Sequence, residues 1–75
     1  MITEQEAESI ALEYIPNDEN PYKIITNLEI INGIWSIEVY HKNEDLDIFI
    51  TSVKINRNGI VSELMKKYIG NKNDL

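Results

Sequence analysis

The Asn32-Gly33 pair constrains the fold more than any other feature of this sequence. It lies between two runs in which apolar residues alternate with polar ones, YKIITNLEII before the pair and IWSIEVYH after it. Asn-Gly suits a two-residue type I′ turn, whose twist matches that of the two strands it joins. The sequence therefore predicts a β-hairpin made of strands 22–31 and 34–41.

The turn also predicts how these two strands pair. With Ile31 opposite Ile34, one face of the hairpin carries three further pairs: Ile30 with Trp35, Leu28 with Ile37, and Thr26 with Val39. The other face then carries Ile25 opposite Tyr40, with two polar pairs beside it. A slip of one residue would exchange the two faces, so we expect this register. We also expect Trp35 to be the centre of the core, packed against Ala11, Ile15, Ile30 and Val53.

A helix is predicted before the hairpin. Thr3 and Glu6 form the pattern of a capping box, which favours a helix start at Glu4. The apolar residues that follow recur at helical spacing, and Pro16 ends the pattern because the residue before a proline is disfavoured in the helical conformation. We expect a helix over residues 4–15 and a loop over 16–21, where the sequence reads PNDENP.

The last third of the chain permits two interpretations. Residues 48–56 alternate as a third strand, which would extend the hairpin into an antiparallel meander. After Asn58-Gly59, apolar residues recur at positions 61, 64, 65, 68 and 69, the spacing of one helix face, and Gly70 suits a helix C-terminus. We therefore expect an α+β domain with a closing helix over 61–69, and a short fourth strand is the alternative.

Composition narrows the functional classes. Thirteen acidic and seven basic residues in a chain of 75 give a net charge of -6, which opposes nucleic-acid binding and favours a basic partner. There is no cysteine for disulfides or thiolate metal sites. The N-terminal segment lacks the pattern of a signal peptide, and no stretch reaches the ~20 apolar residues of a membrane span. We expect a cytoplasmic protein, or a mature fragment of a larger or secreted one, with no membrane partner.

No motif indicates catalysis. The single histidine, His41, has no sequence pattern that links it to a serine, and the three glycines are explained as turn or cap residues. The segment HKNEDLD, residues 41–47, gathers oxygen donors but lacks the order of a calcium-binding loop. We expect no enzyme activity, no cofactor and no metal, and whether the 41–47 loop binds a cation stays open.

The order of these patterns resembles PepSY-type domains. The matching segments are ITEQEAESIALEYI, the Trp-bearing strand GIWSIEVY, and ITSVKINRNGIVSEL, which ends in a residue-x-x-x-Gly-x-Val turn. Similar patterning occurs in small immunity proteins that neutralise toxins. The resemblance, which covers residues 3–64, implies a non-catalytic domain that binds and in some contexts inhibits another protein.

Two binding hypotheses follow. In the first, the protein is an inhibitor or immunity-type module that meets a basic partner with acidic residues of its helix and of the 41–47 loop: Glu4, Glu8, Glu13, Glu44, Asp45 and Asp47. In the second, it is a structural domain that forms a homodimer through a semi-apolar sheet face made of Ile25, Ile31, Ile34, Tyr40, Ile48 and Ile50.

Overall fold

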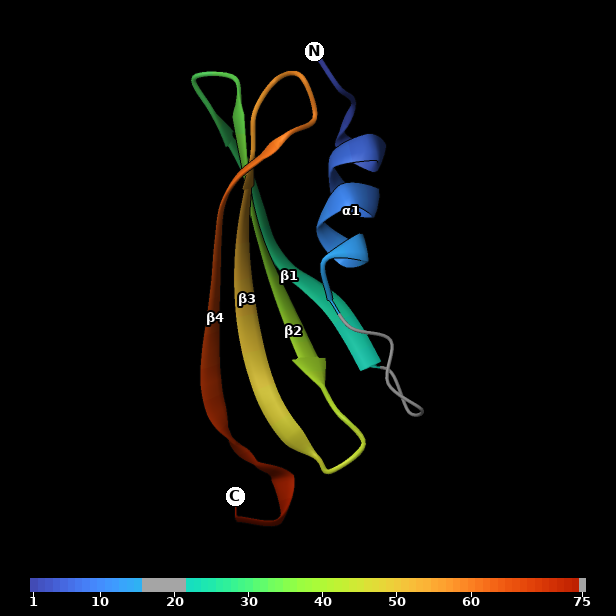
Figure 1. Ribbon diagram of the computed structural model, residues 1–75, viewed down its shortest axis with the longest axis vertical. Helices are drawn as coiled ribbons and strands as arrows, with labels where there is room; N and C mark the ends of the chain where they lie inside the picture. The colour runs from blue at the N-terminus through green and yellow to red at the C-terminus, as the bar shows by residue number, and fades with distance from the viewer. Residues whose placement is uncertain (16–21, 75) are drawn as a thin grey trace.

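The computed structural model describes residues 1–15 and 22–74. One helix is followed by four strands and a short 3-10 turn: α1 (Glu4–Glu13), β1 (Tyr22–Ile31), β2 (Ile34–Lys42), β3 (Asp47–Ile55), β4 (Val61–Asn71) and η1 (Lys72–Asp74). Consecutive strands pair antiparallel in the order β1-β2-β3-β4, so the sheet is a simple meander (Figure 1). The loop predicted over 16–21 lies outside the described residues.

The start of α1 follows the capping box. The Glu6 backbone N–H donates to Thr3 Oγ1 over 3.2 Å, and the Thr3 backbone N–H donates to Glu6 Oε1 over 3.0 Å. These two bonds satisfy donors that a helix N-terminus otherwise leaves without partners. The helix ends at Glu13 rather than at residue 15, and Ala7 and Ala11 are its fully buried residues.

The β1–β2 hairpin has the predicted turn, and most of the predicted register. Asn32 and Gly33 both have positive φ, 54° and 78°, as a type I′ turn requires. Pairing runs as expected from Ile31–Ile34 to Asn27–Glu38. A bulge at Thr26 then shifts the strand, so that Ile25 rather than Thr26 lies opposite Val39.

The bulge corrects the prediction for Ile25. We expected Ile25 opposite Tyr40 on the open face, whereas Ile24 takes that position and Ile25 packs against the core. The physical reason is burial: the extra residue lets an isoleucine face the core while the polar Thr26 stays exposed.

The predicted closing helix over 61–69 is wrong, and the fourth-strand alternative fits. At the turn, Asn56 Oδ1 accepts the N–H groups of Asn58 and Ile60, and Gly59 has a φ of +84°. This geometry returns the chain antiparallel to β3, and β4 pairs with β3 along nearly its whole length. The pairing satisfies backbone groups of β3 that a helix would leave open.

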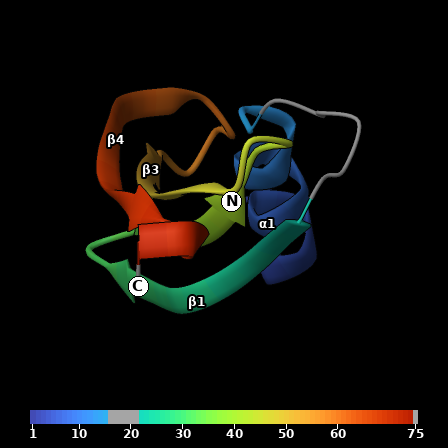
Figure 2. The same cartoon turned by 90° about the horizontal axis from the view of Figure 1, so that it is seen from below.

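The core lies between α1 and one face of the sheet. Its buried residues are Ala7, Ala11, Ile15, Trp35, Ile37, Val39, Val53 and Ile55. Ile30 was expected beside Trp35 as a core residue but is 42% exposed, because α1 packs mainly over β2 and β3 rather than over the outer strands. Figure 2 shows α1 on one side of the sheet and β4 at the sheet edge away from the helix. In the described residues, no helix is long and apolar enough to cross a membrane.

Candidate interaction surface

The six acidic residues predicted to bind a partner do not gather into one patch. Glu4 lies at the start of α1, near one end of a molecule 41 Å long, whereas the turn that carries Glu44 and Asp45 forms the other end with the C-terminal segment (Figure 1). Glu4, Glu13, Glu44 and Asp45 are exposed. The helix and loop therefore present separate acidic regions to solvent.

Asp47, the first residue of β3, has a structural role beside the β2–β3 turn. Its two carboxylate oxygens accept hydrogen bonds from the side-chain amides of Asn43, over 3.3 Å, and Asn71, over 3.0 Å. Asn43 Oδ1 also accepts the backbone N–H groups of Asp45 and Asp47. Asp47 thus joins the turn to the end of β4. Across residues 1–15 and 22–74, no three His, Asp or Glu side chains lie together as metal ligands would.

His41 is part of the packed interior. It is 5% exposed, its Nε2 lies 2.7 Å from Thr51 Oγ1, and its ring stacks on Phe49 with centroids 5.4 Å apart. A buried polar ring needs such a partner, because an unpaired polar group in the interior costs free energy. The geometry gives His41 a structural role.

The sheet face away from α1 is open. Large apolar side chains there are partly or largely exposed, including Ile31 at 59% and Met65 at 61%. Polar and charged side chains lie among them: Ser36, Glu38, Ser52, Lys54, Glu63 and Lys67. Of the isoleucines expected on this face, Ile25 lies on the other side, and Ile48 is only 4% exposed.

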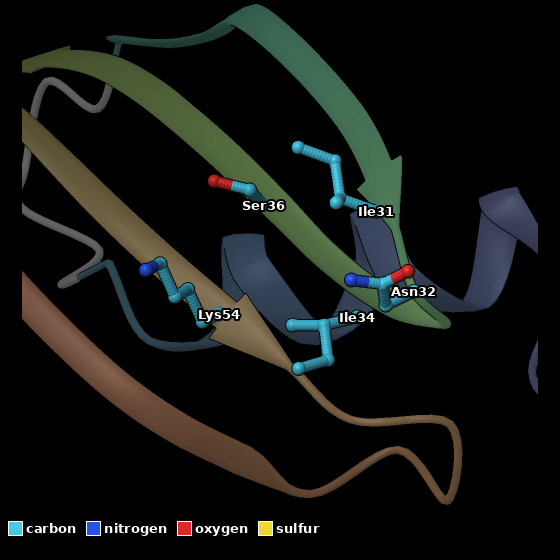
Figure 3. A pocket seen from close by; sticks show the side chains of 5 residues that line it. All are labelled: Ile31, Asn32, Ile34, Ser36 and Lys54. Carbon is cyan, nitrogen blue, oxygen red and sulfur yellow. The ribbon is translucent and has the colours of Figure 1, made fainter.

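A shallow trough crosses this open face. Its first hollow, about 280 Å³, lies beside the hairpin turn and is lined by Ile31, Asn32, Ile34, Ser36 and Lys54 (Figure 3). Figure 3 shows these side chains on the side of the sheet opposite α1. Two further hollows, of about 230 Å³ each, continue the trough to β4. One of them shares Ser36 and Lys54 with the first hollow, and the two share Ser52 and Met65 with each other.

Strand β4 is an exposed edge with apolar residues on both faces. Leu64, Met65, Tyr68 and Ile69 are between 42% and 61% exposed. On the helix side, the Tyr68 ring contacts Phe49 edge-on, with centroids 5.6 Å apart. An edge strand also leaves a row of backbone N–H and C=O groups without strand partners.

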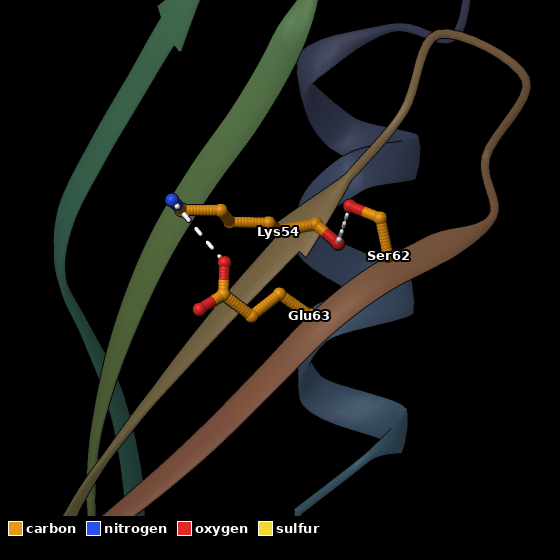
Figure 4. Close-up of polar contacts among 3 residues, drawn as sticks. All are labelled: Lys54, Ser62 and Glu63. Carbon is orange, nitrogen blue, oxygen red and sulfur yellow. Dashed lines mark hydrogen bonds and ion pairs between the residues drawn. The ribbon is translucent and has the colours of Figure 1, made fainter.

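A polar contact ties β4 to β3 on the open face. Lys54 Nζ lies 3.3 Å from Glu63 Oε2, and Ser62 Oγ donates to the Lys54 carbonyl over 3.3 Å (Figure 4). Both charged side chains are 50% exposed, so the ion pair contributes about 1 kcal/mol or less to folding. Its charges remain accessible to a partner.

Strand β4 was not predicted as a surface, because the spacing of its apolar residues predicted a helix over 61–69. The signal that could have found it is Asn58-Gly59, a dipeptide typical of a hairpin turn between two strands.

Comparison of the chain with protein-family models, with curated proteins and with solved structures gave no match. The resemblance to PepSY-type domains therefore stays a hypothesis.

Proposed function

We propose that this protein is a non-catalytic protein-binding module that uses its open sheet face and the β4 edge. The observation that supports this proposal is the concentration of exposed large apolar side chains on that surface: Ile24, Ile31, Ile34, Leu64, Met65, Tyr68 and Ile69. Clusters of exposed apolar side chains with polar residues around them are typical of interaction sites.

The surface has the composition of a recognition site. Apolar residues supply the free energy of burial, while Glu38, Lys54, Glu63 and Lys67 supply charges of both signs that select a complementary partner. The free edge of β4 adds backbone donors and acceptors that can pair with a further strand.

The acidic residues have a different role in this proposal. They place negative charge along α1 and at the far turn, which speeds the encounter with a basic partner. These residues are Glu4, Glu8, Glu13, Glu44 and Asp45. Contact itself is made by the sheet. Inhibition of the partner, as in an immunity protein, is one outcome of such contact.

Site-specific photocrosslinking tests the proposal. A benzophenone amino acid at Met65 on the open face should form a discrete protein adduct in cells that naturally produce the protein. The matched control is the same amino acid at Gln5, which is exposed on α1. An adduct of position 65 with a different protein should disappear with Ile31→Asp, which places a charge on the apolar trough.

Equal adducts from positions 65 and 5, or an adduct of position 65 with a different protein that survives Ile31→Asp, would count against the sheet as the binding surface. An adduct from position 5 alone would instead support the acidic helix as the contact region.

A further inference from the structure

The regular part of β4 carries a symmetric charge pattern. Its pairing with β3 is uninterrupted from Glu63 to Tyr68, between a bulge at Ser62 and another at Ile69. On the open face of this segment lie Glu63, Met65 and Lys67, an acid and a base at equal distances on either side of an apolar residue.

We propose that two copies of this chain associate by pairing their β4 strands antiparallel, with Met65 on the two-fold axis. This inference rests on the proposed function and adds a second copy at the β4 edge, while the open face stays available to the basic partner. In this register, Glu63 of each copy lies opposite Lys67 of the partner subunit, so one symmetric contact forms two complementary charge pairs. The two four-stranded sheets then join into one continuous sheet.

Other symmetric registers are less favourable. A two-fold axis at Lys66 or at Lys67 places that lysine opposite its own copy, and like charges directly opposite each other destabilise a strand pair. An axis at Leu64 avoids this repulsion. However, it brings no acid opposite a base, and it moves the centre of the pairing toward the bulge at Ser62. Only the register centred on Met65 joins opposite charges twice.

The other sheet edge, β1, is less suited to this pairing. The bulge at Thr26 lies in the middle of β1 and interrupts its regular backbone. The ammonium group of Lys23 donates to the carbonyls of Leu12 and Ile15 at the end of α1, which ties this edge to the helix.

The position of α1 leaves room for a second copy at β4. The helix packs against β2 and β3, and Figure 2 shows β4 at the edge away from it. On the helix side of β4, Leu64 and Tyr68 are 50% and 57% exposed, and both would be partly covered by the added strand. Pairing of one strand edge buries less surface than a broad interface, so the dimer should dissociate on dilution.

Charge exchange tests both the dimer and its register. Sedimentation equilibrium should show wild-type protein passing from monomer to dimer as its concentration rises. Glu63→Lys and Lys67→Glu should each raise the dimer dissociation constant by about tenfold or more, because each substitution converts two attractive pairs into repulsive ones. An equimolar mixture of the two variants should form a mixed dimer about as tight as wild type.

Two controls separate the β4 contact from a general effect of charge and from folding. Glu29→Lys makes the same change of charge as Glu63→Lys, but on β1 at the other edge of the sheet, so its dimer should be close to wild type. Because the chain has no cysteine, Met65→Cys should form a disulfide-linked dimer under a mild oxidant. Lys67→Cys should not, because its two thiols would be about 14 Å apart along the strands.

Wild-type protein that is monomeric at every concentration would overturn the inference. So would variants whose mixture gains nothing over the separate proteins, or a cross-link at position 67 in place of 65. If the protein is monomeric while the photocrosslinker at Met65 captures a different protein through the open face, this inference fails and the proposed function stands. If neither result is obtained, both fail.

Discussion

Gly59 is the residue at which the β3–β4 turn can be tested most sharply. Its φ of +84° is a conformation that residues with a side chain rarely adopt, at a cost of about 1–2 kcal/mol. A Cβ at this position would lie 3.3 Å from Ile2 Cγ2 and 3.5 Å from Ile10 Cδ1. A side chain at position 59 is therefore disfavoured both by the backbone conformation of the turn and by the neighbouring side chains.

Gly59→Val should destabilise the protein by about 2–5 kcal/mol. The estimate adds the backbone cost to about 1–3 kcal/mol for forcing extra methyl groups into occupied space. A chain of 75 residues has a total stability of about 4–11 kcal/mol, so this loss is a large part of it. Urea unfolding followed by the fluorescence of Trp35, the single tryptophan, measures the change.

Two comparisons separate the backbone and packing contributions. Gly59→Asn should cost less than Gly59→Val, because asparagine tolerates positive φ. In a double-mutant cycle, Ile2→Ala should reduce the penalty of Gly59→Val, because it removes the nearest atom. A Val variant as stable as wild type would refute the turn geometry, and a penalty unchanged by Ile2→Ala would refute the packing argument.

Other predictions address the core, the helix cap and the charges. Trp35→Ala should cost about 3–5 kcal/mol in urea unfolding followed by circular dichroism, because Trp35 is 93% buried in the core between sheet and helix. Thr3→Ala should cost about 1 kcal/mol in the same assay by removing the helix cap. Hydrogen bonding to Thr3 lowers the pKa of Glu6 below its ordinary value of 4.5, and the bond to the Thr3 backbone has a larger effect than the bond to the Thr3 side chain. The stability that ionised Glu6 adds should therefore be present at neutral pH and should be lost as the pH falls from 4.5 through the lower pKa of the folded state. Glu6→Gln should remove this pH dependence of stability. A triple variant should reverse the charge of three exposed or half-exposed acids: Glu8→Lys, Glu13→Lys and Asp45→Lys. It should keep the fold, and stopped-flow measurements at low salt should show slower association with a basic partner. Unchanged association would mean that these acids serve solubility alone.

The features that could be predicted from the sequence are those set by local chemistry. Asn32-Gly33 specified a turn with two positive φ values, and Thr3 with Glu6 specified the helix cap, because neighbouring residues alone determine both. The bulge at Thr26 could not be predicted in this way. It depends on the burial of Ile25 against residues distant in sequence.

Strand β4 was assigned wrongly for a related reason. Apolar residues at 61, 64, 65, 68 and 69 suit one face of a helix, but they equally suit a bulged strand that is apolar on both faces. Pairing with the otherwise open edge of β3 favours the strand over the helix. This pairing is a tertiary contact, so it cannot be seen in the local pattern of residues. Similarly, charge alone marked Asp47 as a binding residue, whereas its contact with Asn71 depends on the folded arrangement of the turn and β4.

The proposed dimer places the contact between copies at β4 rather than at the acidic helix α1. Amide chemical shifts of uniformly ¹⁵N-labelled protein, recorded as its concentration rises, test this claim most directly. Association through β4 should produce progressive shifts centred on residues 63–67 and little change in α1. Shifts centred on the α1 residues Glu4, Glu8 and Glu13, or no shifts at any concentration, would contradict the β4 dimer.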